Sequence, residues 1–294
     1  MSTEHEGPIA CDGVGELPRP LVDVDRLAAV LGVPGVVVLD ASVGAHRSAG
    51  RCIPGARRFD IDGAMSDPAS PLPHTMPQAA CFAAEMRALG VNGTDTVVVY
   101  DAAGIYSSAR AWWMLRAMGF DRVSVLDGGL PAWEAAGHPV EGRGAGVAGA
   151  ACPAGDFTAR PRPGMLVGSG AVVEALADPY SAVLDARSRQ RFAGTVAEPR
   201  PGLRGGHMPG ALNLPFDAVQ RDGRMLSRGE LRSLLRASAG SRERLVVSCG
   251  SGVTACVLAL AAECAGYREV SVYDGSWSEW GRPSELPVVT GPAR

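Results

Sequence analysis

The chain repeats itself at a spacing of about half its length, and this repeat limits the folds that it can adopt. Three motifs of the first half return in the second half in the same order. They are residues 36–41 (VVVLDA) with 182–186 (AVLDA), 53–56 (IPGA) with 208–211 (MPGA), and 126–133 (LDGGLPAW) with 273–280 (YDGSWSEW). Because such self-similarity is typical of duplicated units, the sequence predicts two similar domains in tandem. A chain of 294 residues is long for one core and sufficient for two.

Each half alternates short β-branched runs with helical patterns, as in the run 96–100 before the pattern 107–118. This alternation predicts an α/β fold in which each domain has a mainly parallel sheet flanked by helices. We expect a flexible N-terminus at 1–20, a first domain at 21–140, a linker at 141–164 and a second domain at 165–294. The linker is expected to be exposed and mobile, since residues 141–155 are rich in Gly and Ala without an apolar period.

Cys249 follows an apolar run and begins the loop CGSGVT, which leads into a helical pattern from 253 to 263. A short buried strand is expected to deliver the thiol to the carboxyl end of a sheet, where loop N–H groups and the positive helix end face the sulfur. These surroundings favour the thiolate, the nucleophilic form of cysteine. An inert core cysteine needs none of them, so the sequence favours a nucleophile.

The same loop argues against one class of cysteine enzyme. Cysteine phosphatases need an arginine six residues after the nucleophile, because a planar guanidinium grips the phosphoryl dianion with two hydrogen bonds. That position is Ala255 here. A sulfur atom carried as a persulfide on Cys249 needs only loop N–H donors and the helix end. Sulfur transfer therefore fits better than phosphoryl transfer.

The loop CGSGVT resembles the active loop of 3-mercaptopyruvate sulfurtransferases, in the rhodanese superfamily. Thiosulfate:cyanide rhodaneses usually carry a basic loop of the type CRKGVT, whereas the mercaptopyruvate enzymes carry a neutral one. The resemblance covers nearly the whole chain and includes residues 70–74 (SPLPH), 110–113 (RAWW) and 273–280. It implies two tandem rhodanese-like domains with the active site at their interface.

The resemblance also assigns two arginines to substrate binding. Arg191 and Arg200 match a GRF-type segment followed by EPR, whose arginines hold the substrate's carboxylate and carbonyl in this family. Guanidinium groups suit that role because they stay charged and offer forked donors. By contrast, Arg187, Arg189 and Arg204 are expected to be solvated surface charges.

We expect the Cys249 thiolate to attack the sulfur of 3-mercaptopyruvate, release pyruvate and become a persulfide, which a thiol such as thioredoxin then reduces. Neither metal nor cofactor is expected. The two arginines and loop donors would stabilise the enolate. Ser251 is assigned to catalysis in a hydrogen-bonding role, and the loop residues assigned to substrate binding are Gly250, Gly252, Val253 and Thr254.

Two positions of the first half depart from an active copy. Asp101 stands where Cys249 stands in the second half, so the first domain is predicted to have no nucleophile. The family's histidine before IPGA is replaced by Cys52, which leaves Ser251 without its usual base; His46 is a weak candidate to replace it. Cys52 itself is either an inert packing residue, which we favour, or a second thiol that resolves the persulfide.

The remaining sequence features exclude several functions. The formal net charge of −3 comes without a basic stripe, so nucleic acid is not an expected partner. No segment is apolar enough to span a bilayer, no cysteine and histidine cluster has metal-ligand spacing, and the number of cysteines is odd, so we expect a cytoplasmic location. Two other functions stay open, a thiosulfate sulfurtransferase and a persulfide carrier with little turnover of small donors.

Overall fold

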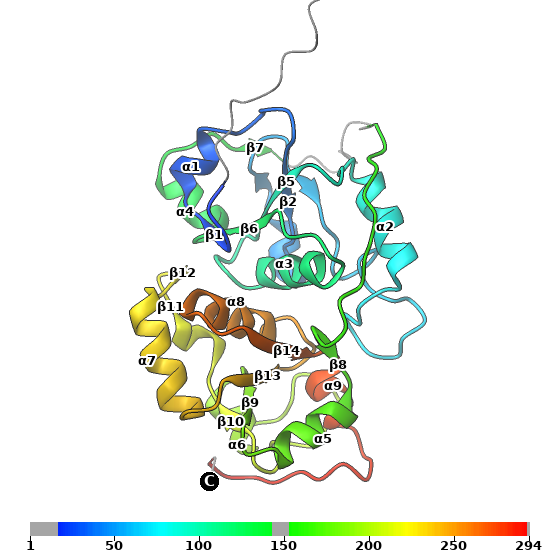
Figure 1. Ribbon diagram of the computed structural model, residues 1–294, viewed down its shortest axis with the longest axis vertical. Coiled ribbons are helices and arrows are strands. Elements are labelled where there is room, and N and C mark those ends of the chain that lie inside the picture. Colours follow the sequence, from blue (N-terminus) through cyan, green and yellow to red (C-terminus); the bar gives the residue numbers. More distant parts are fainter. Residues whose placement is uncertain (1–16, 143–152, 293–294) are drawn as a thin grey trace, which may run out of the picture.

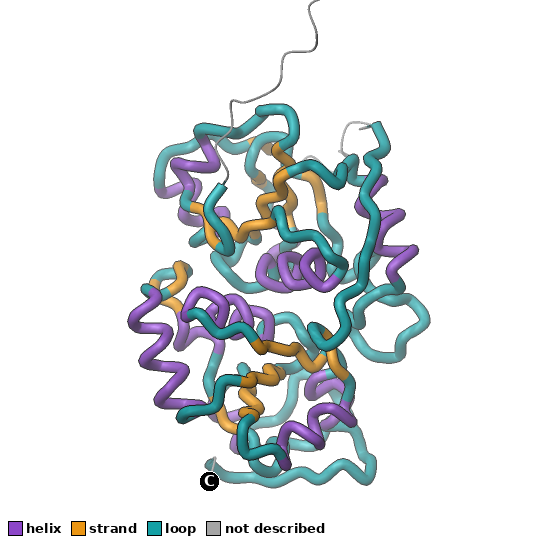
Figure 2. Tube along the Cα trace, in the orientation of Figure 1, coloured by secondary structure: helices purple, strands orange, loops and turns teal. Residues whose placement is uncertain are grey.

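The computed structural model describes residues 17–142 and 153–292, and these residues form two similar halves (Figure 1). In each half the strands lie in the middle and helices lie outside them (Figure 2). Most of the predicted flexible N-terminus lies outside the described residues. Its described end is ordered against the first domain, where Leu17 is buried and the carbonyl of Pro18 accepts a hydrogen bond from Ser124.

The elements of the first half are β1 Leu21–Val22, α1 Val24–Ala28, β2 Val36–Asp40, η1 Gly44–Ser48, β3 Arg51–Cys52, β4 Arg57–Arg58, α2 Ala79–Ala88, β5 Thr96–Tyr100, α3 Ser108–Ala117, β6 Val123–Leu126, α4 Gly129–Ala135 and β7 Glu141–Gly142. Those of the second half are β8 Leu166–Val167, α5 Ser169–Ala177, β9 Ser181–Asp185, α6 Arg189–Ala193, β10 Leu212–Asn213, η2 Phe216–Val219, β11 Gln220–Arg221, β12 Arg224–Met225, α7 Arg228–Ala239, β13 Arg244–Ser248, α8 Ala255–Ala265, β14 Glu269–Tyr273 and α9 Ser276–Trp280.

Both halves contain a five-stranded sheet with the same strand order. The first sheet runs β1-β6-β5-β2-β4 and the second runs β8-β14-β13-β9-β10, and all neighbours in both are parallel. Strands such as VVVLD in β2 and TVVVY in β5 have apolar residues on both faces along their middle because helices cover both faces of a parallel sheet. The predicted α/β fold with two tandem domains is confirmed.

The two domains meet through α3 and α8, which pack against each other across the boundary (Figure 1). Both helices are buried almost all round, as expected for helices enclosed by protein on every side. One hydrophobic cluster therefore continues from the first sheet through Trp112 and Trp113 into the second sheet. This shared core fixes the orientation of each domain relative to the other.

The segment between the domains is bound to the first domain over most of its described length. Residues 141–142 form β7, which pairs with β3, and residues 143–152 of the predicted mobile linker lie outside the described residues. Beyond them, Phe157 is buried, and the N–H groups of Arg160 and Arg162 donate to carbonyls at the end of α3. Figure 1 shows this segment running beside α2 to β8.

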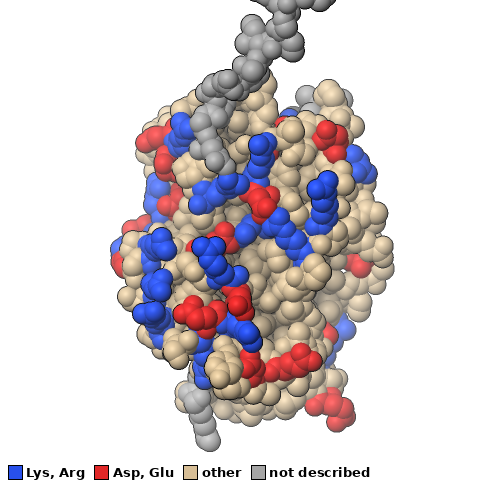
Figure 3. Space-filling view, in the orientation of Figure 1, with Lys and Arg blue, Asp and Glu red and all other residues tan. Residues whose placement is uncertain are grey.

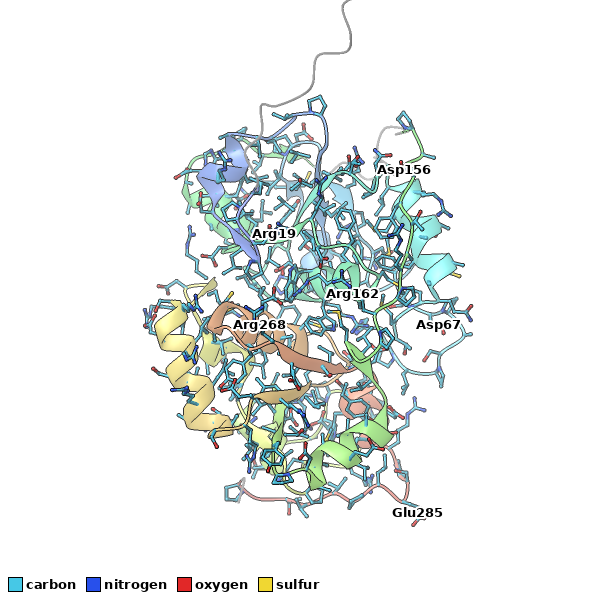
Figure 4. All side chains as sticks on the ribbon, in the orientation of Figure 1. Arg19, Asp67, Asp156, Arg162, Arg268 and Glu285 are labelled. Carbon is cyan, nitrogen blue, oxygen red and sulfur yellow. The ribbon has the colours of Figure 1, made fainter. Side chains whose placement is uncertain are left out.

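Charged side chains of both signs are interspersed over the face shown in Figure 3. Figure 4 labels Arg162 near the domain boundary. Its guanidinium forms two hydrogen bonds with the carboxylate of Asp121, and Arg116 lies 3.8 Å from the same carboxylate. This arrangement ties the connecting segment to the first domain. In residues 17–142 and 153–292, no helix is both long and apolar enough to cross a membrane.

Candidate active site

Cys249 lies directly after β13, at the carboxyl end of the second sheet, and it is buried. The loop that it begins is fixed by the start of α9. The N–H of Cys249 donates to Oγ of Ser276 at 3.2 Å, and its carbonyl accepts from the N–H of Trp277 at 3.0 Å. Ser278 holds the next carbonyl, that of Gly250, with both its N–H and its hydroxyl. The thiol therefore sits on a rigid loop.

The helix after the loop begins at Ala255, two residues later than the sequence predicts. Gly252 has a φ of +75°, a conformation that glycine adopts at low cost, and the chain then tightens into short turns. These turns keep Val253 and Thr254 out of the regular helix. Within the described residues, no protein acceptor contacts the N–H groups of Ser251, Thr254 and Ala255, so the loop offers donors beside the thiol.

The corresponding loop of the first domain is occupied by its own carboxylate. Asp101 directly follows β5 and is completely buried. Its carboxylate accepts hydrogen bonds of 2.8–2.9 Å from the backbone N–H groups of Ala103, Tyr106, Ser107 and Ser108. A loop of this shape therefore turns its N–H groups inward onto an anion.

Ser251 does have a histidine beside it, and the expectation that Cys52 leaves it without one is wrong. Nδ1 of His74 lies 2.9 Å from Oγ of Ser251, and Nε2 of the same ring lies 3.1 Å from Oδ1 of Asp62. The histidine comes from the loop between β4 and α2, which leaves the first domain and reaches the boundary; Figure 4 labels Asp67 on this loop. Three side chains thus form a continuous chain of hydrogen bonds.

The surroundings of His74 keep its ring neutral near pH 7. Burial lowers the pKa of His74 below its ordinary value; Asp62 raises it, and the charges of Arg110 and Arg200 lower it further. A neutral imidazole that contacts a hydroxyl can receive the hydroxyl's proton. His74 is therefore suited to act as a base through Ser251.

Neither Cys52 nor His46, the candidate for a replacement base, is the partner of Ser251. Cys52 is buried on β3, where its thiol is 3.7 Å from the carbonyl of Glu141. His46 lies on η1 with its ring 6.2 Å from the ring of Tyr106. The structure thus assigns Cys52 a packing position. The sequence signal for His74 was its place in the SPLPH segment, which resembles the family but gives no link to Ser251.

Arg191 and Arg200 both lie against the nucleophile loop. A β-carbon placed on Gly250 would be 3.2 Å from Nη2 of Arg191 and 3.7 Å from Nη1 of Arg200. Glu198 holds Arg191 through contacts of 2.5 Å and 3.3 Å. Two guanidinium groups therefore converge beside Cys249, where an anionic substrate group would meet them.

Arg187 is not a surface charge, contrary to expectation. Its side chain is fully buried, forms hydrogen bonds with Asp185 and Glu198, and lies 3.9 Å above the ring of Trp277. Two buried carboxylates compensate its charge, which a polar sequence context does not reveal. The expectation for Arg204 is also wrong, because it is half-buried and donates to the carbonyls at 280, 281 and 286. Arg189 is exposed, as predicted.

Tyr106 is a further site residue that the sequence did not indicate. It belongs to the first domain's counterpart of the nucleophile loop, and its ring packs edge-to-face on Phe216 of the second domain, 5.5 Å between centroids. Burial raises the pKa of Tyr106, and the charge of Cys249 raises it further. Tyr106 thus lies close enough to Cys249 for a charge on the sulfur to act on the Tyr106 hydroxyl. Over the described ranges no group of three His, Cys, Asp or Glu side chains could hold a metal ion.

Comparison with known proteins identifies the family of the chain. The model of the rhodanese-like domain matches the chain twice, at residues 23–136 and 170–282. The chain belongs to the rhodanese family. It is 40% identical over 277 residues to the 3-mercaptopyruvate sulfurtransferase of Escherichia coli K12, covering 91% of this chain and 96% of that protein.

Other rhodanese-family members give the same result. Identity is 39% over 298 residues with thiosulfate/3-mercaptopyruvate sulfurtransferase 1 of Arabidopsis thaliana, covering 92% of this chain and 78% of that one. The crystal structure of SseA from Escherichia coli, a 3-mercaptopyruvate sulfotransferase, superposes with a TM-score of 0.77 at 37% identity, over 88% of this chain and 99% of that chain. These comparisons confirm the predicted family and the prediction that the protein is a sulfurtransferase.

Proposed function

We propose that this protein transfers sulfur from 3-mercaptopyruvate, through a persulfide on Cys249, to a thiol acceptor, with release of pyruvate. The observation that carries the proposal is the convergence of three groups on one loop. Cys249 is the nucleophile, Arg191 and Arg200 lie beside it, and a serine and histidine pair stands two residues away. Thiolate, anion-binding groups and a proton relay are what the reaction requires.

In the first half-reaction the Cys249 thiolate attacks the sulfur of the donor. The new S–S bond forms as the bond between that sulfur and C3 of the donor breaks, and the electron pair passes into the enolate of pyruvate. Arg191 and Arg200 stabilise the carboxylate and the enolate oxygen. Through Ser251, His74 receives the proton of the donor thiol and returns a proton to C3, which gives pyruvate.

The first domain provides a physical analogy for the persulfide. There, the carboxylate of Asp101 accepts hydrogen bonds from four backbone N–H groups of its loop. The matching donors in the second loop include the N–H groups of Ser251, Thr254 and Ala255. A persulfide on Cys249 would place its terminal sulfur anion among these donors, where it needs no metal or cofactor.

In the second half-reaction a thiol takes the outer sulfur and regenerates Cys249. A protein thiol such as reduced thioredoxin or a small thiol would serve. A depression of about 300 Å³ lies beside Arg200. The described residues include five free cysteines, Cys249 among them. Reduced thiols suit the cytoplasm, which we propose as the compartment.

The two alternatives differ in how well the site supports them. Thiosulfate appears in the name of the Arabidopsis relative. This donor is a dianion, and the loop at 249–254 carries no charged side chain to meet it. A carrier role drew its support from the missing base. Since His74 contacts Ser251, that support is gone.

The test is pyruvate formation from 3-mercaptopyruvate with dithiothreitol, beside thiocyanate formation from thiosulfate with cyanide. Cys249→Ser should abolish both, while Cys81→Ser, which removes an exposed free thiol, should change neither. Pyruvate release that depends on Cys249 supports the proposal. A higher kcat/KM with thiosulfate would replace it by the first alternative. Turnover of neither donor, with Cys249 still accepting sulfur from a protein persulfide, would favour the carrier.

A further inference from the structure

Arg110 is a completely buried charge whose partner belongs to the other domain. It lies on α3, and its Nη2 is 2.7 Å from Oδ1 of Asp274, the residue after β14. A buried guanidinium is tolerated only where a carboxylate and hydrogen-bond acceptors compensate it. The Arg110–Asp274 pair is therefore an integral part of the packed domain boundary.

The Arg110–Asp274 pair holds the segment of His74 from two sides. Nη2 of Arg110 also donates to the carbonyl of His74 at 2.7 Å. The other oxygen of Asp274 accepts the N–H of Met76 at 2.9 Å. One ion pair thus fixes a carbonyl and an N–H group two residues apart, which defines the path of the backbone between them.

His74 needs such support because its backbone is strained. Its φ is +61°, in the left-handed region that residues with a β-carbon rarely adopt. Conformations of this kind persist where the surrounding contacts impose them, and they gather at functional sites. The two hydrogen bonds from the Arg110–Asp274 pair are contacts of that type.

The same pair also touches the nucleophile loop. Nη1 of Arg110 lies 3.5 Å from the carbonyl of Gly252. A β-carbon on Gly252 would be 2.9 Å from the carbonyl oxygen of Asp274 and 3.3 Å from Nη1 of Arg110. The backbones of His74 and of the residue after Ser251 are therefore both placed by one ion pair.

We infer that Arg110 and Asp274 are positioning residues that align His74 with Ser251 across the domain boundary. Neither needs to touch the substrate, and they act through the backbone of His74. This role presupposes the proposed function, because it concerns the proton transfer of that reaction.

Arg110→Met tests the inference together with His74→Ala and the double variant. Arg110→Met should lower the kcat for 3-mercaptopyruvate by about 10²-fold, within the range of general acid–base catalysis, and should add no further loss to His74→Ala. The KM should change little, since Arg191 and Arg200 are untouched. Arg110→Lys, which keeps a charge near Asp274, should recover part of the rate.

Two further measurements separate positioning from a general structural effect. The rate of alkylation of Cys249 by iodoacetamide, followed by mass spectrometry, should fall far less than the kcat, because Ser276, Trp277 and Ser278 still hold the nucleophile loop when the 3.5 Å contact of Arg110 is lost. The charge of Arg110 lowers the pKa of His74, together with Arg200 and against Asp62. Its removal should therefore move the acid limb of kcat/KM to higher pH.

Arg116→Met is the matched control. Arg116 also lies on α3 and also pairs with an acid of the second domain, Glu263, but it has no contact with His74. The kcat of Arg116→Met should equal that of the wild type. If Arg110→Met fails to fold, Asp274→Asn, which keeps the size of the side chain, replaces it.

The outcomes distinguish the two levels of the proposal. Wild-type protein that releases no pyruvate refutes the proposed function. Three results would refute only the positioning role while the wild type turns over: independent, multiplicative losses in the double variant, alkylation of Cys249 slowed as much as the kcat, or an equal loss in Arg116→Met.

Discussion

Nδ1 of His74 and Oγ of Ser251 are 2.9 Å apart, although the two residues belong to different domains and are separated by 177 positions in the chain. Neither domain contains the complete relay. The first domain supplies the histidine and Asp62, and the second supplies the serine and Cys249. Docking of the domains through α3 and α8 is therefore a condition for the proton transfer that we propose.

Replacing His74 by alanine should lower the kcat for 3-mercaptopyruvate by about 10²-fold or more, because Ser251 loses the group that receives its proton. Transfer from thiosulfate requires no proton at carbon, so its kcat should fall much less. Steady-state assays of both donors check this expectation. An equal loss with both donors would show that His74 serves the loop structure instead.

The acid limb of kcat/KM for 3-mercaptopyruvate should lie below pH 6.5. Burial lowers the pKa of His74, and the ring must be neutral to accept a proton. Activity is therefore retained as the pH falls through the ordinary range of histidine pKa values. It is lost only when the pH falls below the lowered pKa of His74 and the ring becomes protonated. Asp62→Asn removes the group that raises the pKa of His74, so the acid limb of kcat/KM of this variant should move to still lower pH. A limb that moves upward would contradict the assignment.

Gly250→Ala should raise the KM for the donor while leaving the fold intact. The added methyl group would meet the ends of Arg191 and Arg200, which are flexible and can move aside. Displaced guanidinium groups bind the substrate carboxylate less well. Gly252→Ala is the contrasting variant. Its φ is +75° and its β-carbon would meet the carbonyl of Asp274, so it should lower the thermal midpoint instead.

Arg187→Met should lower the free energy of unfolding by about 3–5 kcal/mol, because it leaves the buried carboxylate of Asp185 without its partner. Urea unfolding followed by tryptophan fluorescence measures the change. Arg189→Met, at an exposed position two residues away, should change it by less than about 0.5 kcal/mol. Equal effects of the two substitutions would mean that the buried network contributes nothing.

The fold could be predicted because the local patterns and the repeat agree. The apolar run of β5 matches its predicted bounds, and β13 ends where the position of Cys249 requires. The start of α8 was placed two residues early, since periodicity does not register the turn that Gly252 makes.

The site was predicted only in part, and the missing parts are long-range. The cysteine and the loop are contiguous in sequence, so spacing could identify them. His74 meets Ser251 only after the domains dock, and no spacing encodes that contact. Arg187 has the same appearance in sequence as Arg189, and its burial depends on Glu198, eleven residues later. The sequence therefore did not reveal which charged side chains are buried and paired in the folded protein.

The carboxylate of Asp101 limits how much cargo the molecule can hold. Its four hydrogen bonds occupy donors of the first loop with a carboxyl group that belongs to the chain and that no acceptor can remove. In the proposed cycle only the second loop can be loaded. The protein then carries a single sulfur equivalent for each 30.4 kDa polypeptide, and must unload it before the next donor can react.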